Sequence, residues 1–216
     1  MEICNLTDKK EVTECVKKSA QILRTGGVIL FPTDTLYGLG ADALSDEAVE
    51  KIYTIKGRDE RKPMHAVASD IAMIERYAEV PDMARALAKE LMPGALTLIL
   101  KKREGIETGI ARGIATIGFR IPNNPFCLEL AKEFGRPFTV TSANKSGVKP
   151  EFSTKAILQQ LQEGREKINL AIEAGELPER EPSTVVDLSG KEPVILREGA
   201  IPPADIWNLL GSEFQD

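Results

Sequence analysis

The sequence predicts an α/β domain built on a mixed β-sheet, and three observations lead to this fold class. Short β-prone runs alternate with segments of helical periodicity along most of the chain, which is typical of an α/β sheet. Two β-prone runs, 184–188 and 194–196, follow each other without an intervening helix, which favours antiparallel strands added to the sheet. A length of 216 residues with 42% hydrophobic residues suits one sizeable core.

The first predicted elements are a helix and a buried strand. Apolar residues recur at helical spacing before the helix-ending pair 26–27, at Val12, Cys15, Val16, Ala20 and Leu23. The continuous β-prone run 28–31 is bounded by a glycine and a proline, which predicts a strand buried on both faces. Residues 32–40 should form a loop at the carboxyl end of this strand, in which Gly38 and Gly40 let the backbone approach a ligand closely.

A second helix should follow this loop. Ser45 is a suitable N-cap, and acidic residues at 46 and 47 occupy the positive first turn of a helix that continues through Ile55. Lys56 and Arg58 should therefore emerge at the C-terminal end of the helix.

The remaining chain alternates in the same way. Strands are predicted over 64–68, 95–101, 116–121, 138–141, 184–188 and 194–196. Helices are predicted over 83–91, 125–134, 153–161 and 204–210, with Ser153 as the cap of the third. The strand over 138–141 should deliver Ser142 and Asn144 at its carboxyl end.

Composition excludes several classes of site. His65 is the only histidine, which argues against a histidine metal cluster and against a Ser-His-Asp triad. Cys4, Cys15 and Cys127 are odd in number and widely spaced, which argues against a disulfide framework and a cysteine-rich zinc site, and we expect them to pack in the core. The net charge of −5 disfavours a general surface for nucleic acid.

The sequence shows no targeting or membrane segment. Apolar stretches such as 28–31 and 96–100 are far shorter than the roughly 20 residues that span a bilayer. Acidic residues at 2, 8 and 11 stand where a secretory signal needs a basic start and an apolar block. We therefore expect a cytoplasmic protein.

Two tripeptides together suggest a site for a phosphate ester. Lys56-Gly57-Arg58 supplies cations that neutralise phosphate, and Ser142-Ala143-Asn144 supplies short hydrogen-bonding groups that orient a phosphoryl oxygen. Each alone has an ordinary explanation, because cations are favoured at a helix C-terminus, and Ser and Asn are common where a strand turns.

Taken with 31–40 (FPTDTLYGLG), 182–186 (PSTVV) and 196–197 (LR), these tripeptides resemble the YrdC-like family of threonylcarbamoyl-AMP synthases, in order over roughly residues 10–200. The resemblance implies a twisted, open mixed sheet with flanking helices around a concave ligand cavity. It also implies a single domain over 1–216 with a short C-terminal tail, too short for the extra C-terminal domain of longer family members.

The activity implied by the resemblance is a nucleotidyl transfer. L-threonine, bicarbonate or CO2 and ATP would be joined into threonylcarbamoyl-AMP and pyrophosphate, with Mg²⁺ on the triphosphate. A threonylcarbamoyl transferase would then use the product to modify the adenosine next to the anticodon of tRNAs that read codons starting with A. Because a carbamate is already a charged nucleophile, no strong general base is needed, which agrees with a single histidine.

The resemblance also assigns residues. Lys56 and Arg58 would be the catalytic cations, and the nucleotide would be bound by Lys56, Arg58, Thr116, Ser142, Asn144 and Arg197. Threonine would be held by Thr33, Tyr37, Arg120 and Ser183, with the Arg120 guanidinium on its carboxylate. No protein ligand for a metal is assigned. Asp34 is interpreted as a turn residue, and the alternative for Arg120 is an internal salt bridge.

The sequence departs from the family pattern in two places. His65 is not clearly in register with the histidine that often follows the Lys-x-Arg region, so its role stays open. Ser146-Gly147 is followed by Val148 rather than by the Ser-Pro of many members.

Two rival functions are open at this stage. One is a module that binds double-stranded RNA or ribosomes, against which the acidic net charge weighs, although direct RNA binding remains an alternative. The other is the carbamoyl-transfer domain of hydrogenase maturation, whose zinc-finger cysteines and acylphosphatase-like segment have no counterpart here.

Overall fold

A computed structural model describes residues 1–6, 9–57, 59 and 63–211. Within these residues, ten strands form one sheet in the spatial order β1-β8-β2-β3-β7-β4-β6-β5-β9-β10. The strands are β1 Glu2–Asn5, β2 Val28–Pro32, β3 Tyr37–Gly40, β4 His65–Val67, β5 Leu96–Lys101, β6 Thr116–Arg120, β7 Phe138–Ser142, β8 Ile168–Glu173, β9 Thr184–Asp187 and β10 Val194–Arg197.

The sheet is mixed, as predicted. β2 runs parallel to β8 and antiparallel to β3, and β5 runs antiparallel to β6 and parallel to β9. The predicted late antiparallel pair is β9 and β10. All five residues of β2 are buried, which confirms a strand covered on both faces.

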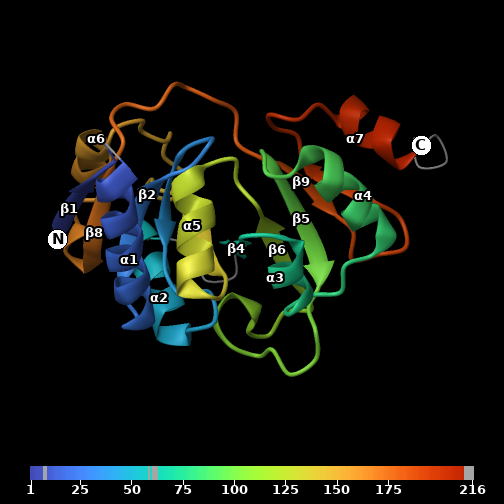
Figure 1. Cartoon of the computed structure of the whole chain (residues 1–216), viewed down its shortest axis with the longest axis horizontal. Helices are drawn as coiled ribbons and strands as arrows, with labels where there is room; N and C mark the ends of the chain where they lie inside the picture. The colour runs from blue at the N-terminus through green and yellow to red at the C-terminus, as the bar shows by residue number, and fades with distance from the viewer. Residues whose placement is uncertain (7–8, 58, 60–62, 212–216) are drawn as a thin grey trace.

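Helices pack around this sheet in separate groups. They are α1 Lys9–Arg24, α2 Asp46–Lys56, α3 Ile71–Glu75, α4 Asp82–Leu91, α5 Pro125–Phe134, α6 Thr154–Gln160 and α7 Pro203–Leu210, with short 3-10 turns η1 Gly109–Ala111 and η2 Arg165–Lys167. Helices α1 and α5 contact each other beside β2, whereas α4 contacts α7 near β5 and β9 (Figure 1). The segment 174–183 between β8 and β9 crosses from one group to the other (Figure 1).

The ends of α2 follow the predicted local chemistry. The side chain of Ser45 accepts a hydrogen bond from the backbone N–H of Ala48 and so satisfies one of the exposed donors of the first turn. Gly57 ends the helix with a φ of 54°, in the left-handed region where a side chain is disfavoured. The helix thus ends at Lys56.

The loop predicted over 32–40 is a tight turn followed by β3, which pairs with β2 and β7. Of its two glycines, Gly38 lines the cavity of the candidate active site, and the expectation that its backbone lets a ligand approach closely stays a prediction. For Gly40 it is wrong, because a Cβ there would lie 2.8 Å from the Phe31 ring. Gly40 therefore makes room for core packing rather than for a ligand.

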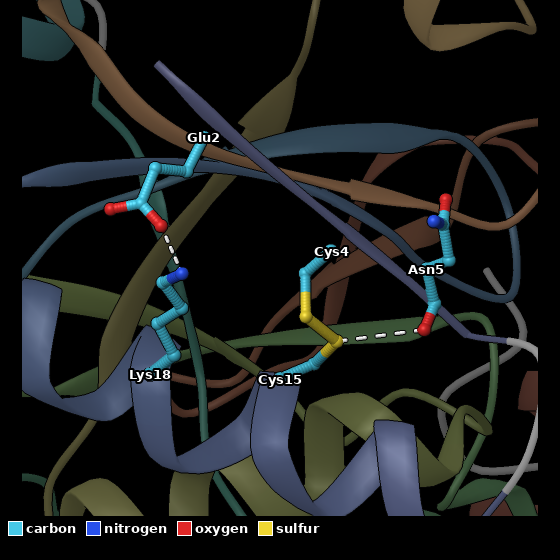
Figure 2. The surroundings of a disulfide bond; sticks show 5 residues. All are labelled: Glu2, Cys4, Asn5, Cys15 and Lys18. Atoms are coloured by element: carbon cyan, nitrogen blue, oxygen red, sulfur yellow. Dashed lines mark hydrogen bonds and ion pairs between the residues drawn. A yellow bond between two sulfur atoms is a disulfide. The ribbon is translucent and has the colours of Figure 1, made fainter.

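The N-terminal residues form an element that the sequence analysis does not predict. Cys4 of β1 and Cys15 of α1 form a disulfide with their Cα atoms 5.8 Å apart, and Glu2 and Lys18 form an ion pair beside it (Figure 2). The expectation that the cysteines only pack is therefore wrong for this pair and confirmed for the buried, free Cys127. The reason is that no strand is predicted before residue 28, so nothing brings Cys4 beside α1.

No helix in the described part of the chain has both the length and the apolar character that crossing a membrane requires.

Candidate active site

The main cavity, of about 510 Å³, opens where the β2–β3 turn, the ends of β6 and β7 and the segment before β9 meet. Six of the ten residues assigned from the sequence line it: Thr33, Tyr37, Arg120, Ser142, Ser183 and Arg197. Lys56, Asn144 and Thr116 are not among the lining residues, and Arg58 lies outside the described residues. The structure thus brings all four predicted threonine residues and two of the six predicted nucleotide residues to one cavity.

Arg120 stands at the end of β6 with its side chain only 5% exposed. Its Nη2 donates to Asp34 Oδ1 at 2.7 Å, its Nη1 to Thr35 Oγ1 at 2.8 Å and its Nε to the carbonyl of Gly94 at 3.3 Å. Asp34 is therefore more than a turn residue, because its carboxylate balances a buried cation. A guanidinium has five N–H groups, so two remain without a partner among the described residues.

The β2–β3 turn orients this arginine. The Thr33 hydroxyl donates to the carbonyl of Leu36 at 2.7 Å and accepts from the backbone N–H of Thr35 at 3.0 Å. When the single hydroxyl proton of Thr33 points at Leu36, Thr35 is the donor in the 3.0 Å contact between the two threonine hydroxyls. Thr35 Oγ1 in turn accepts a hydrogen bond from Arg120 Nη1, so the β2–β3 turn fixes the orientation of the guanidinium.

A second arginine, Arg197 of β10, also lines the cavity. Arg197 of β10 donates from Nη2 to the carbonyl and the hydroxyl of Ser183, at 2.7 and 3.0 Å, and from Nε to the same carbonyl at 3.0 Å. Ser183 Oγ also lies 2.8 Å from Thr97 Oγ1 of β5. Both Nη1 hydrogens of Arg197 lack a partner within the described chain.

Both guanidinium groups are partly removed from water, and their positive charges interact. Burial lowers the pKa of Arg120, and the carboxylate of Asp34 opposes this shift. Burial lowers the pKa of Arg197 as well, and the positive charge of Arg120 lowers it further. Because arginine stays protonated, the two charges repel each other, and an anion between them would relieve that repulsion. We call Arg120, Ser183 and Arg197 the donor wall.

Tyr37 contributes through its position rather than its acidity. Its hydroxyl donates to the carbonyl of Gly175 at 2.9 Å and accepts from the N–H of Ala174 at 3.0 Å. Burial raises its pKa to about 12, so the phenol is neutral in the physiological range. Tyr37 therefore anchors the start of the segment 174–183, whose later residues line the cavity.

Lys56, Ser142 and Asn144 form a second polar cluster, which we call the lysine turn. Lys56 is 2% exposed, and its Nζ donates to the carbonyl of Ser142, to the carbonyl of Asn144 at 2.9 Å and to Asn144 Oδ1 at 3.2 Å. The Ser142 hydroxyl donates to the same Oδ1. The ammonium thus holds the turn after β7, and of the three residues only Ser142 lines the cavity.

Thr116 lies in a neighbouring hollow of about 710 Å³ beside α2 and η1. Pro63 lines both this hollow and the main cavity, so the two adjoin. His65, whose role the sequence leaves open, lies at the start of β4 and lines the main cavity.

The sequence reasoning missed the residues that support the donor wall. They are Asp34, Thr35 and Thr97, together with Arg180, whose Nη1 donates to the carbonyl of Asp34 at 2.7 Å. A usable signal existed for Asp34, because an arginine predicted inside a strand needs a nearby carboxylate. Thr97 had no such signal, since a threonine in a β-prone run is ordinary.

The family model of Sua5, YciO and YrdC proteins, described as "Telomere recombination", matches residues 21–199. A Methanocaldococcus jannaschii protein, provisionally named a threonylcarbamoyl-AMP synthase, is 36% identical over 92% of this chain and 90% of its own length. The Bacillus subtilis threonylcarbamoyl-AMP synthase is 35% identical over 91% of this chain, which spans only 56% of that relative.

The fold leads to the same relatives. The Sua5 protein of Pyrococcus abyssi, solved with L-threonine, superposes with a TM-score of 0.88 at 34% identity, covering 98% of this chain and 61% of that one. The mixed sheet, the flanking helices and the extent of the sequence match agree, and the chain belongs to the Sua5/YciO/YrdC family.

Proposed function

We propose that this chain is a threonylcarbamoyl-AMP synthase that acts in the cytoplasm and joins L-threonine, bicarbonate or CO2 and ATP into threonylcarbamoyl-AMP and pyrophosphate. The observation that best supports it is the donor wall, where two desolvated arginines and a serine offer hydrogen-bond donors to one cavity. Such a wall favours carboxylate and phosphate oxygens. Relatives named for this activity and one solved with L-threonine agree with it.

The reaction needs little chemistry from the protein. The threonine amine attacks CO2 and loses one proton, which gives a carbamate. A carbamate oxygen then attacks the α-phosphorus of ATP, and the bond from phosphorus to the bridging oxygen breaks so that pyrophosphate leaves with the electron pair. Because the nucleophile is already charged, positioning and charge neutralisation are the main contributions of the site.

We divide the site into two ends. At the threonine end, Arg120 and Ser183 hold the carboxylate, while Thr33 and Tyr37 shape the turn and the rim. At the nucleotide end we place Arg197, Ser142, Asn144, Thr116, Lys56 and Arg58. Lys56 acts there as a positioning residue, because its buried ammonium is bonded to the turn that carries Ser142 and affects the ligand by holding that turn in place.

Magnesium belongs to the substrate in this proposal. Mg²⁺ keeps several waters and is commonly bound through phosphate oxygens, so it would enter as the complex with ATP and neutralise charge on the departing pyrophosphate. The product would pass to a threonylcarbamoyl transferase that modifies tRNA.

One assay tests the proposal. Pyrophosphate release from ATP is measured with L-threonine and bicarbonate both present and with each omitted in turn. We expect release to require both, because the nucleophile is made from both. Equal release with ATP alone would refute the synthase activity.

A further inference from the structure

The hydroxyl pair Thr97–Ser183 sits deep in the donor wall. Thr97 is 1% exposed and Ser183 is 5% exposed, and their oxygens are 2.8 Å apart. They come from neighbouring parallel strands, since β5 pairs with β9 directly after Ser183. Both line the main cavity.

The protons of this pair can be counted. Ser183 Oγ already accepts from Arg197 Nη2 at 3.0 Å. Among the described residues, Thr97 Oγ1 is hydrogen-bonded to Ser183 Oγ and to no other atom, so its proton finds an acceptor only when it points at Ser183 Oγ. With Thr97 as donor, Ser183 accepts twice, and its own proton is left to point into the cavity.

The opposite order is unfavourable. If Ser183 donated to Thr97, the proton without a protein acceptor would be that of Thr97, at 1% exposure, rather than that of Ser183, at 5% exposure, and an unsatisfied polar group costs more free energy the more deeply it is buried. An anion in the cavity adds to the preference, because it attracts the Ser183 proton.

We propose that Thr97 is a positioning residue that holds the Ser183 hydroxyl as a pure hydrogen-bond donor, so that this end of the cavity accepts the carboxylate of the amino-acid substrate. The inference rests on the proposed function for the identity of that anion. The proton order itself follows from the contacts of Thr97, Ser183 and Arg197.

The placement of Thr97 argues against simple packing. Thr97 is itself 1% exposed within β5, so an apolar β-branched residue would fit the strand at least as well. A hydroxyl at this position is stabilising only if it is hydrogen-bonded, and Ser183 is its partner.

A double-mutant cycle tests the proposal. Thr97→Val removes the hydroxyl and keeps the shape, Ser183→Ala removes its partner, and both are combined; L-threonine and inorganic phosphate are titrated by calorimetry. We expect Thr97→Val to weaken anion binding about three- to tenfold. In the Ser183→Ala background it should have no further effect, because Thr97 acts through Ser183.

Two more variants separate positioning from folding. Thr97→Ser retains the hydroxyl and should restore most of the affinity. Thr139→Val is the matched control, since Thr139 is fully buried on β7, its hydroxyl accepts from the N–H of Ala41 at 2.9 Å, and it does not line the cavity. It should leave both affinities unchanged.

The outcomes decide the inference in every case. Wild-type affinity in Thr97→Val, or an equal loss with and without Ser183, overturns it while leaving the proposed function intact. If wild type binds phosphate but not threonine, the proposed function fails, and the double-mutant cycle measured with phosphate decides the inference. If wild type binds neither anion, the proposed function and the inference are both refuted.

Discussion

The donor wall and the lysine turn are built from the same kinds of polar residue but distribute their hydrogen bonds differently. In the donor wall, Arg120 uses three N–H groups on protein acceptors and keeps two without a partner among the described residues. In the lysine turn, the three N–H groups of Lys56 meet three oxygens of Ser142 and Asn144. One cluster offers donors to the cavity, and the other stabilises the loop beside it.

This difference shows that a cation assigned to a ligand can serve it in two ways. A planar guanidinium can be held by a carboxylate and still present hydrogen bonds on another edge. A buried ammonium with matched acceptors instead determines where its neighbours lie. Substitutions in the two clusters should therefore have distinguishable effects on stability and on binding.

The largest expected effect is at Arg120. Arg120→Met should lower the free energy of unfolding by about 3–5 kcal/mol, because it leaves the Asp34 carboxylate unpaired at 10% exposure. It should also abolish detectable threonine binding. Urea unfolding and calorimetric titration measure the two effects.

Adding Asp34→Asn to the Arg120→Met variant separates the effect on stability from the effect on threonine binding. The double variant should recover much of the stability and none of the threonine affinity, because the buried charge is gone but the guanidinium is still missing. Recovery of binding in the double variant would mean that Arg120 serves only the ion pair.

Lys56→Met should cost less stability, about 1–3 kcal/mol, because it leaves neutral carbonyl oxygens rather than a charge without a partner. We expect weaker ATP binding with threonine affinity preserved, since the Lys56 ammonium is hydrogen-bonded to Ser142 and Asn144, which we place at the nucleotide end. Isothermal titration of each ligand measures this. Loss of threonine affinity with normal ATP affinity would contradict the division into two ends.

Within the lysine turn, Ser142 and Asn144 should behave differently. Ser142→Ala removes a residue that lines the cavity and should weaken ATP binding about tenfold with little change in stability. Asn144→Ala should lower stability by about 1–3 kcal/mol, because Asn144 accepts from Lys56 and donates to the carbonyl of Val148 at 2.6 Å. Equal stability of the two variants would show that Asn144 is not a structural member of the turn.

The smallest effect concerns Tyr37 at high pH. Its pKa is raised from 10.0 to about 12, so the neutral phenol is favoured by the fold, and its contribution is fully present below pH 10 and lost as pH rises through 12. Tyr37→Phe should flatten the decline of unfolding free energy in that window. A decline unchanged from wild type would mean that another group controls it.

The sequence predicted the regular elements best where local signals agree. Ser45, Gly57 and the apolar run of β2 each act within a few residues, and the structure has the expected helix end, cap and buried strand. Strands β1, β3 and β8 are absent from the prediction. β3 lies in a glycine-rich stretch with low β-propensity and exists because it pairs with β2 and β7.

Six of the ten residues assigned from the sequence line one cavity, but the sequence did not predict the contacts among them. The motif resemblance led to Arg120, Ser183 and Arg197, which the structure brings to one cavity. The partners Asp34 and Thr97 lie 86 positions away from Arg120 and Ser183 respectively, so only the fold reveals those pairings. The same applies to Lys56, which was expected to emerge at a helix end and whose burial comes from the turn after β7.

The most direct test of the donor wall compares L-threonine with L-threonine amide, which lacks the carboxylate. Both are titrated by calorimetry into wild type and into the Arg120→Met/Asp34→Asn variant. We predict that wild type binds the acid at least about tenfold more tightly than the amide, and that the variant loses this preference. Equal affinity of wild type for both ligands, or an unchanged preference in the variant, would contradict the account.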